Sequence, residues 1–190
     1  MPVSLIPFTM PEPAEIPAHI STMLRQLPPD EAVRRALELL LEIDVAETMV
    51  YERLDEAEGV RLGHVVSADP ERGRELEESL RREEPPDGPG PESCTSLAQT
   101  ALDQDSALLV MGQAEAGEET PLPSGLRDFL LAGEQQGSLG FVYVLTLVGK
   151  GARPQGALTL IRPASAGPLN HEQPNIAEAV RRELGTILDQ

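Results

Sequence analysis

The sequence has few aromatic residues: no tryptophan, two tyrosines and three phenylalanines among 190 residues. Its apolar fraction is nevertheless 40%, so a core must be built mainly from Leu, Val, Ile and Ala, which are among the residue types most often buried. A chain of this length is typical of one domain with room for an arm or an insertion. A ligand pocket with aromatic walls is therefore disfavoured from the outset.

Cysteine and lysine each occur once, as Cys94 and Lys150. A single cysteine excludes an internal disulfide and fits a reducing cytoplasm, which is the location we expect. The other basic residues are all arginine, which we attribute to genome composition or to a high-salt habit rather than to a site. The net charge of −17 argues against nucleic-acid binding, because the phosphates would be repelled.

Long apolar runs are also missing, and none approaches the ~20 residues of a membrane span. We expect no signal peptide, because the N-terminus lacks a basic region and is interrupted by Pro2, Pro7, Pro11 and Pro13. His19, His64 and His171 are far apart and show no metal-binding spacing. The chain has no phosphate-loop spacing and no serine in a nucleophile-elbow context.

The strongest feature present is the stretch Leu139–Pro163, in which two runs rich in β-branched residues flank a Gly-rich turn. This pattern predicts a β-hairpin with a loop longer than two residues. The first run is apolar at consecutive positions. We therefore expect it to be a central strand of a sheet that is covered on both sides.

Periodicity and breaker residues predict the other elements. Asp30 and Asn170 are candidate caps of two amphipathic helices. Alternation should place Val60, Leu62, His64 and Val66 on one face of a strand. The predicted helices are 18–26, 30–43, 95–103, 124–134 and 170–190, and the other predicted strands are 46–54, 60–67 and 107–111.

Two segments have a different composition. Residues 1–29 form a Pro-rich arm with a short helix, and we expect part of the arm to lie on the domain or on a partner. Residues from about 69 to 93 are highly charged and then rich in Pro and Gly. They predict a solvated helix that leads into a flexible loop.

The order of three segments points to a known family. Residues 32–64 give a helix, a strand, an acidic turn and a second strand; residues 96–110 give a helix, a turn and a short strand; residues 156–172 lead from a strand into the terminal helix. Together these segments resemble a GAF domain that covers about residues 30–190. A PAS-like or roadblock-like domain is the alternative.

The resemblance implies an α+β fold with an antiparallel sheet of five or six strands and helices on both faces. It also implies a pocket between the sheet and the segments inserted before the long hairpin. Members of the family bind cyclic nucleotides, tetrapyrroles, haem or small metabolites, and many only dimerise. Residues 30–190 would form one such domain, with the charged stretch of about 69–93 as a flexible insertion.

The candidate ligand-binding residues are strand residues that can stack or form hydrogen bonds: Phe141, Tyr143, Thr146, Thr159 and His64. His64 would serve as a haem ligand or a base, although an ordinary strand histidine is the simpler interpretation. Alternation leaves open which strand face lines the pocket.

Several ligands of the family are disfavoured by single residues. The Asn-Lys pair typical of cyclic-nucleotide binders is absent, because Lys150 follows Gly149. Covalent tetrapyrrole attachment usually requires a histidine beside the cysteine, and Cys94 has none. Methionine sulfoxide reduction needs more than one cysteine. We therefore expect no cofactor. Cys94 would be a reactive thiol only if a helix N-terminus lowers its pKa.

These observations favour a non-catalytic sensory or regulatory module that binds a small ligand and signals through protein contacts. The alternative is an interaction domain whose pocket is filled by its own side chains. An enzyme ranks third, because no acid, base, nucleophile or metal set converges.

We also expect a homodimer through the terminal helix. Ile187 and Leu188 lie at the end of its apolar stripe, where we expect little of the sheet to be left to cover. Arg181 and Arg182 would pair with Glu38 and Glu42 of a second copy, with apolar contact supplying the affinity. A separate signalling protein is a further expected partner, whereas nucleic acid and membrane are not.

Overall fold

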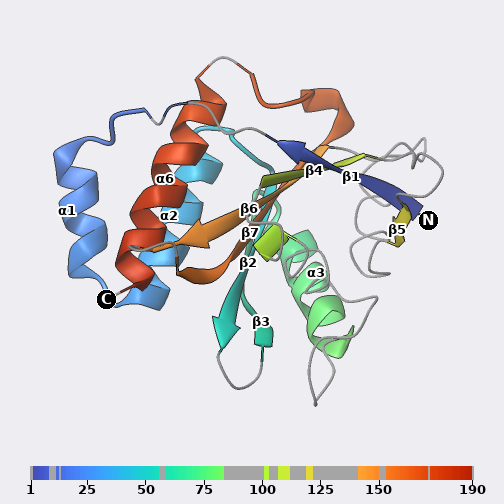
Figure 1. The fold of residues 1–190 in the computed structure, drawn as a ribbon, viewed down its shortest axis with the longest axis horizontal. Helices are drawn as coiled ribbons and strands as arrows, with labels where there is room; N and C mark the ends of the chain where they lie inside the picture. The colour runs from blue at the N-terminus through green and yellow to red at the C-terminus, as the bar shows by residue number, and fades with distance from the viewer. Residues whose placement is uncertain are drawn as a thin grey trace.

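The computed structural model describes residues 2–8, 12, 14–55, 59–83, 101–102, 107–111, 119–121, 141–149, 153–170 and 172–189. They form one α+β unit around a seven-stranded sheet in the order β3-β2-β7-β6-β4-β1-β5 (Figure 1). Every pair of neighbouring strands is antiparallel. The strands are β1 (Pro2–Phe8), β2 (Thr48–Asp55), β3 (Gly59–Ser67), β4 (Ala107–Met111), β5 (Glu119–Pro121), β6 (Phe141–Val148) and β7 (Pro154–Arg162).

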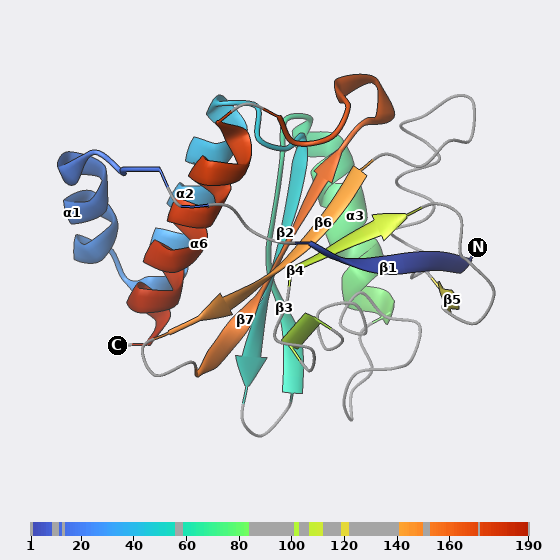
Figure 2. The same cartoon turned by 45° about the horizontal axis from the view of Figure 1, so that its top comes forward.

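Helices lie on both sides of this sheet, as Figure 2 shows. On one side lie α1 (Ala18–Gln26), α2 (Pro29–Glu42) and α6 (Gln173–Leu188), and on the other lies α3 (Pro70–Glu83). We call the side with α2 and α6 the helical face of the sheet and the other side the opposite face. None of the helices in the described part of the chain is long and apolar enough to cross a membrane.

The long hairpin is confirmed as β6 and β7, which pair from Phe141↔Arg162 to Val148↔Pro154. The expected sheet of five or six strands is too small. Residues of the predicted Pro-rich arm form β1, which pairs with β4 and carries β5 on its other side. Without β1, strand β4 would lie at the edge of the sheet and expose unpaired backbone groups. Pairing with β1 covers that edge of β4.

The main core lies between the helical face and the helices. Its sheet side is formed by Met49, Tyr51, Tyr143, Leu145, Leu147, Leu158 and Leu160. Its helix side comes from apolar stripes of α2 and α6, including Val33, Leu37, Leu40, Val180, Leu184 and Ile187. The helical spacing of these positions is what the sequence predicted.

The expectation that Val60, Leu62, His64 and Val66 share one face is wrong. Tyr51 pairs with His64, but the next residue, Glu52, pairs with Leu62, so Gly63 is an extra residue in a β-bulge. A bulge reverses the facing of the residues that follow it. His64 and Val66 therefore lie on the helical face, whereas Val60 and Leu62 lie on the opposite face. A Cβ at Gly63 would meet the Tyr51 ring, which explains why this residue has no side chain.

Helix starts differ slightly from the sequence expectation. Helix α2 begins at Pro29, so Asp30 lies in the first turn instead of capping it. A carboxylate there still suits the helix dipole. Helix α3 is capped by Asp69, whose Oδ1 accepts hydrogen bonds from the Glu71 and Arg72 amides at 3.1 and 3.3 Å. Leu76 and Leu80 of this helix are buried, so α3 packs against the domain and is more than the solvated helix that its charge predicted.

Candidate functional site

The opposite face of the sheet carries buried polar residues at its centre. Alternation along β2, β7 and β6 puts three cross-strand rows on this face: Thr48–Ile161–Val142, Val50–Thr159–Val144 and Glu52–Ala157–Thr146. None of these nine side chains is more than 4% exposed. The Thr48 hydroxyl is satisfied, because its Oγ1 lies 2.8 Å from Ser67 Oγ.

Three polar side chains surround the small Ala157. Glu52 and Thr146 flank it in the same row, and Thr159 lies two residues along β7, diagonal to both. Directly opposed Cβ atoms in such a sheet lie about 4.5–5.5 Å apart, and diagonal residues about 7–8 Å apart. We call Glu52, Thr146, Ala157 and Thr159 the Ala157 niche. It places one carboxylate and two hydroxyls around a methyl group.

The Thr159 hydroxyl is the most informative atom of the niche. Thr159 is 1% exposed, and its Oγ1 has no hydrogen-bond partner within the structure as described. Leaving a buried hydroxyl without a partner costs about 1–3 kcal/mol. A valine would fill the same space without that cost. The Thr159 hydroxyl therefore keeps its capacity to donate and accept a hydrogen bond, and among the described residues the buried Nε2 atom of His64 is likewise without a hydrogen-bond partner.

The side chains of the niche are suited to hydrogen bonding. Threonine hydroxyls donate and accept, and an ionised carboxylate only accepts. A ligand that brings N–H or O–H donors suits this set. Among the described residues, no three His, Cys, Asp or Glu side chains gather as they would around a metal ion.

The five predicted ligand residues do not share one pocket. Thr146 and Thr159 lie together in the niche, but Phe141, Tyr143 and His64 lie on the helical face. The Tyr143 hydroxyl accepts a hydrogen bond from the Leu169 amide at 3.1 Å. Phe141 packs against the main core.

His64 belongs to an aromatic pair on the helical face. Its ring stacks on Tyr51, with centroids 5.9 Å apart and an interplanar angle of 25°. Burial is the main reason that the pKa of Tyr51 is raised to about 12, with a further contribution from the charge of Asp30. This environment is that of a packed core. Cys94, the candidate thiol, lies outside the described residues.

The residues predicted to form a dimer interface are used within the chain. Ile187 is 1% exposed and belongs to the main core, and Leu188 is half-buried against it. Arg181 and Arg182 both bind Glu178 of the same helix. Glu38 and Glu42 lie near Arg35 of their own helix. The end of α6 is covered because the hairpin extends as far as the helix does.

A buried ionic cluster joins α6 to the sheet beside the niche. Glu178, 1% exposed, accepts hydrogen bonds from Arg181 at 2.6 and 2.7 Å and from Arg182 at 2.7 Å. Burial alone would raise the pKa of Glu178, but the hydrogen bonds from the two arginines outweigh burial and lower it. Arg181 also donates to the Thr146 carbonyl at 3.0 Å. Thr146 is thus held on its backbone side by α6.

Sequence reasoning missed Glu52. A carboxylate between Tyr51 and Arg53 looks like a solvated strand position. The signal that points to it is alternation, because Thr48 and Val50 at positions −4 and −2 share its face. Its partners across the sheet, Ala157 and Thr146, become visible only once the strand order and register are known.

Comparisons with known proteins agree on the fold. No family model and no curated protein sequence matches the chain. Among solved structures, the GAF domain/HD domain protein from Geobacter sulfurreducens is similar with a TM-score of 0.59 and 15% identity, over 89% of this chain and 95% of that one. The GAF domain of a protein described as a sensor histidine kinase from Pseudomonas syringae pv. tomato has a TM-score of 0.50 and 15% identity, over 90% and 81% of the two chains. The chain therefore has a GAF-like fold.

Proposed function

We propose that this protein is a non-catalytic regulatory module that binds a small ligand on the opposite face of its sheet, over the Ala157 niche. The observation that carries the proposal is the buried Thr159 hydroxyl without a partner. Its neighbours Glu52 and Thr146 are the other polar residues of the niche, and both are buried. The similar proteins, a GAF domain/HD domain protein and a protein described as a sensor histidine kinase, support a regulatory role by analogy of fold.

The chemistry of the niche selects the ligand class. The Thr159 and Thr146 hydroxyls, which can donate and accept, favour a ligand with hydrogen-bonding groups such as an amide, an alcohol or a nucleobase edge. An anionic group would be disfavoured by the net charge of −17. The ligand is therefore a neutral or cationic small molecule.

A thermal-shift panel of metabolites, run on the wild type and on Thr159→Val, tests the proposal. A ligand that raises the melting temperature of the wild type should lose most of that shift in the variant. Thr48→Val is the matched control, because it removes a hydroxyl from the same face that is already bound to Ser67. The proposal fails if ligand shifts are equal in wild type and Thr159→Val.

The second candidate is an interaction domain without a ligand. It is favoured by one observation: the nine side chains of the three rows are already buried in the protein alone. In that case Thr159→Val should stabilise the protein, because it removes an unsatisfied hydroxyl and nothing else. Native mass spectrometry that finds no bound molecule, together with this stabilisation, would favour the second candidate.

A further inference from the structure

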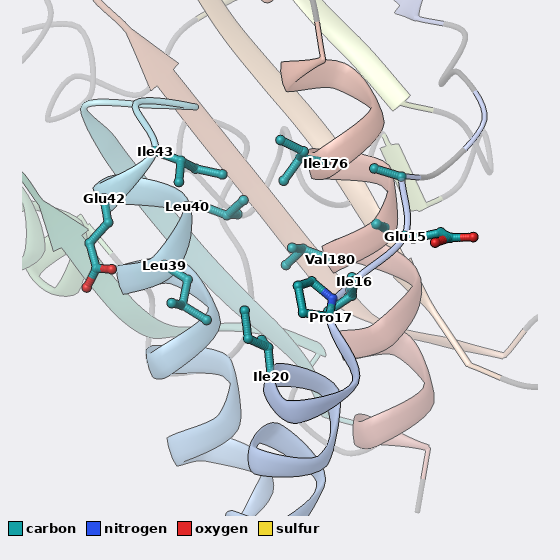
Figure 3. A pocket seen from close by; sticks show the side chains of 12 residues that line it. Glu15, Ile16, Pro17, Ile20, Leu39, Leu40, Glu42, Ile43, Ile176 and Val180 are labelled. Carbon is teal, nitrogen blue, oxygen red and sulfur yellow. The ribbon is translucent and has the colours of Figure 1, made fainter.

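A second cavity lies in the helical layer, on the other side of the sheet from the niche. It has a volume of about 240 Å³ and lies between α1, α2, α6 and the segment that precedes α1 (Figure 3). Leu40 and Val180 form part of its wall and also belong to the main core. The cavity is therefore built on the packed centre of the domain.

The wall of this cavity is almost entirely apolar. Ten of the twelve lining residues are apolar: Ala14, Ile16, Pro17, Ile20, Leu39, Leu40, Ile43, Ile176, Ala179 and Val180. The other two, Glu15 and Glu42, are exposed, and their carboxylates point away from Leu40 and Val180 in Figure 3. None of the twelve described lining residues is cationic; Arg182 lines a neighbouring pocket and binds Glu178.

Backbone groups along the N-terminal wall are already satisfied. The Ala14 amide donates to the Asn175 carbonyl at 3.0 Å, and the Asn175 side chain donates to the Glu12 carbonyl at 2.7 Å. The Pro17 carbonyl accepts from the Ile20 amide at 3.0 Å. A molecule in the cavity is therefore recognised by apolar contact and not by these polar groups.

The volume fixes the size of the occupant. An apolar cavity of about 150 Å³ can hold benzene, whereas pockets for drug-sized ligands begin at about 300 Å³. At about 240 Å³ the cavity accommodates one ring with a short substituent or a medium-length aliphatic chain. The cavity opens to solvent beside exposed Pro17 and Ile43, so an occupant can enter it from the surface.

Helix α1, which forms one wall of the cavity, is attached to α6 by polar contacts at the surface. Ser21 and Arg25 of α1 bind Glu183 of α6, at 2.9 and 2.8 Å. Leu24 is the only residue of α1 that is fully buried. Ile20, Met23 and Leu27 are partly buried against the same core. An occupant that contacts Ile16 and Ile20 on one side and α6 on the other would extend this apolar contact. Binding would therefore hold α1 against the domain.

We propose that this cavity is a binding site for a small, uncharged, apolar molecule, separate from the Ala157 niche and independent of the function proposed for it. Exposed Ile43, with 47% of its surface accessible, lies at the rim, where the apolar part of such a molecule would cover it. The acidic residues at the rim and the net charge of −17 disfavour fatty acids and other apolar anions.

The isoleucines of the chain provide a direct test. Four of the seven isoleucines line the cavity, namely Ile16, Ile20, Ile43 and Ile176, whereas Ile161 lies on the opposite face of the sheet. A protein labelled at the Ile δ1 methyls is titrated with 1-octanol and, in parallel, with octanoate. The expected result is saturable movement of the four cavity methyl signals with octanol, little with octanoate, and no movement of the Ile161 signal.

Two variants sharpen the result. Ala179→Leu fills the cavity and should abolish the octanol response. Ile43→Ser, at an exposed position, should weaken octanol binding by about tenfold, because it removes most of one aliphatic contact. Thr159→Val, across the sheet, should leave the response unchanged.

Three outcomes overturn the proposal. The first is the absence of saturable movement, and the second is equal movement with octanoate or at Ile161. The third is movement of the cavity signals with protein concentration alone, accompanied by dimerisation in sedimentation equilibrium, which would assign the cavity to a second copy of the chain.

Discussion

Replacing Glu178 with glutamine should destabilise the protein substantially. Glu178 holds Arg181 and Arg182, and Arg181 in turn binds the Thr146 carbonyl. The β4–β6 register runs only from Val142 to Val144, so β4 does not pair with Thr146. Arg181 supplies the missing donor, and Glu178 fixes its position.

The magnitude follows from burial. Removing one partner of a buried ion pair costs about 3–5 kcal/mol. Arg181 keeps 20% of its side-chain exposure, and Arg182 keeps 62%, so Arg182 regains water and contributes at most about 1 kcal/mol. We expect the lower end, about 3 kcal/mol. For a domain of this size that corresponds to a fall of roughly 6–12 °C in melting temperature.

The loss of stability in Glu178→Gln should depend on pH. The folded-state pKa of Glu178 is lowered below the ordinary value of 4.5 for a glutamate, so its contribution to stability is fully present above that pH and is lost as the pH falls through the folded pKa. Urea unfolding of wild type and Glu178→Gln should show the full difference at neutral pH and a shrinking difference below about pH 4.5. Arg182→Gln is the control and should change stability by at most about 1 kcal/mol.

Two results would refute this reasoning. The first is a Glu178→Gln variant within about 0.5 kcal/mol of the wild type, the range of ordinary surface changes. The second is a large difference that stays constant from neutral to acidic pH. The first would mean that solvent replaces the ionic cluster at no cost, and the second that the glutamine acts through packing instead of charge.

Three further predictions follow from packing. Gly185→Ala should lower the melting temperature, because its Cβ would meet the Val148 carbonyl oxygen; calorimetry checks it, and an unchanged value would contradict the close approach of α6 to β6. Ile187→Asp with Leu188→Asp should unfold the protein instead of dissociating a dimer, since Ile187 is 1% exposed; retained far-ultraviolet circular dichroism would count against this. Tyr51, with a pKa raised to about 12, should stay neutral at pH 10 while the protein is folded, and the free energy of unfolding should fall as the pH rises from about 10 to 12. An ultraviolet absorbance titration of the wild type, compared with Tyr51→Phe, tests this.

The two long helices α2 and α6 and the hairpin of β6 and β7 were predictable from local periodicity, whereas β1 and β5 were not. The predicted helix 124–134 and most of the predicted helix 95–103 lie outside the described residues. The stripe of Val180, Leu184 and Ile187 in α6 and the continuous apolar run of β6 each required burial, and both are buried. The strand between residues 107 and 111 has the bounds that its composition suggested. Where the local hydrophobic pattern agrees with the tertiary packing, the sequence is sufficient to predict the element.

The candidate site was only half predictable. Alternation showed that Thr146 and Tyr143 lie on different faces, but the side that the helices cover is a tertiary fact. The bulge at Gly63 shows the same limit, because a single extra residue reverses the facing of His64 relative to Leu62. Glu52 acquires its meaning only from the register that places it beside Ala157.

Helix α6 contacts both proposed sites, and this gives the two proposals a physical connection. Ala179 and Val180 line the apolar cavity, whereas Arg181, the next residue, donates a hydrogen bond to the backbone carbonyl of Thr146, whose side chain belongs to the niche. Two ligands can influence each other only if both change the energy of a shared element. Here that element is one helical turn, fixed by Glu178. The Glu178→Gln variant therefore tests more than stability: if each ligand alters the affinity of the other in the wild type, the loss of this anchor should reduce the effect, even though Glu178 itself does not line the apolar cavity.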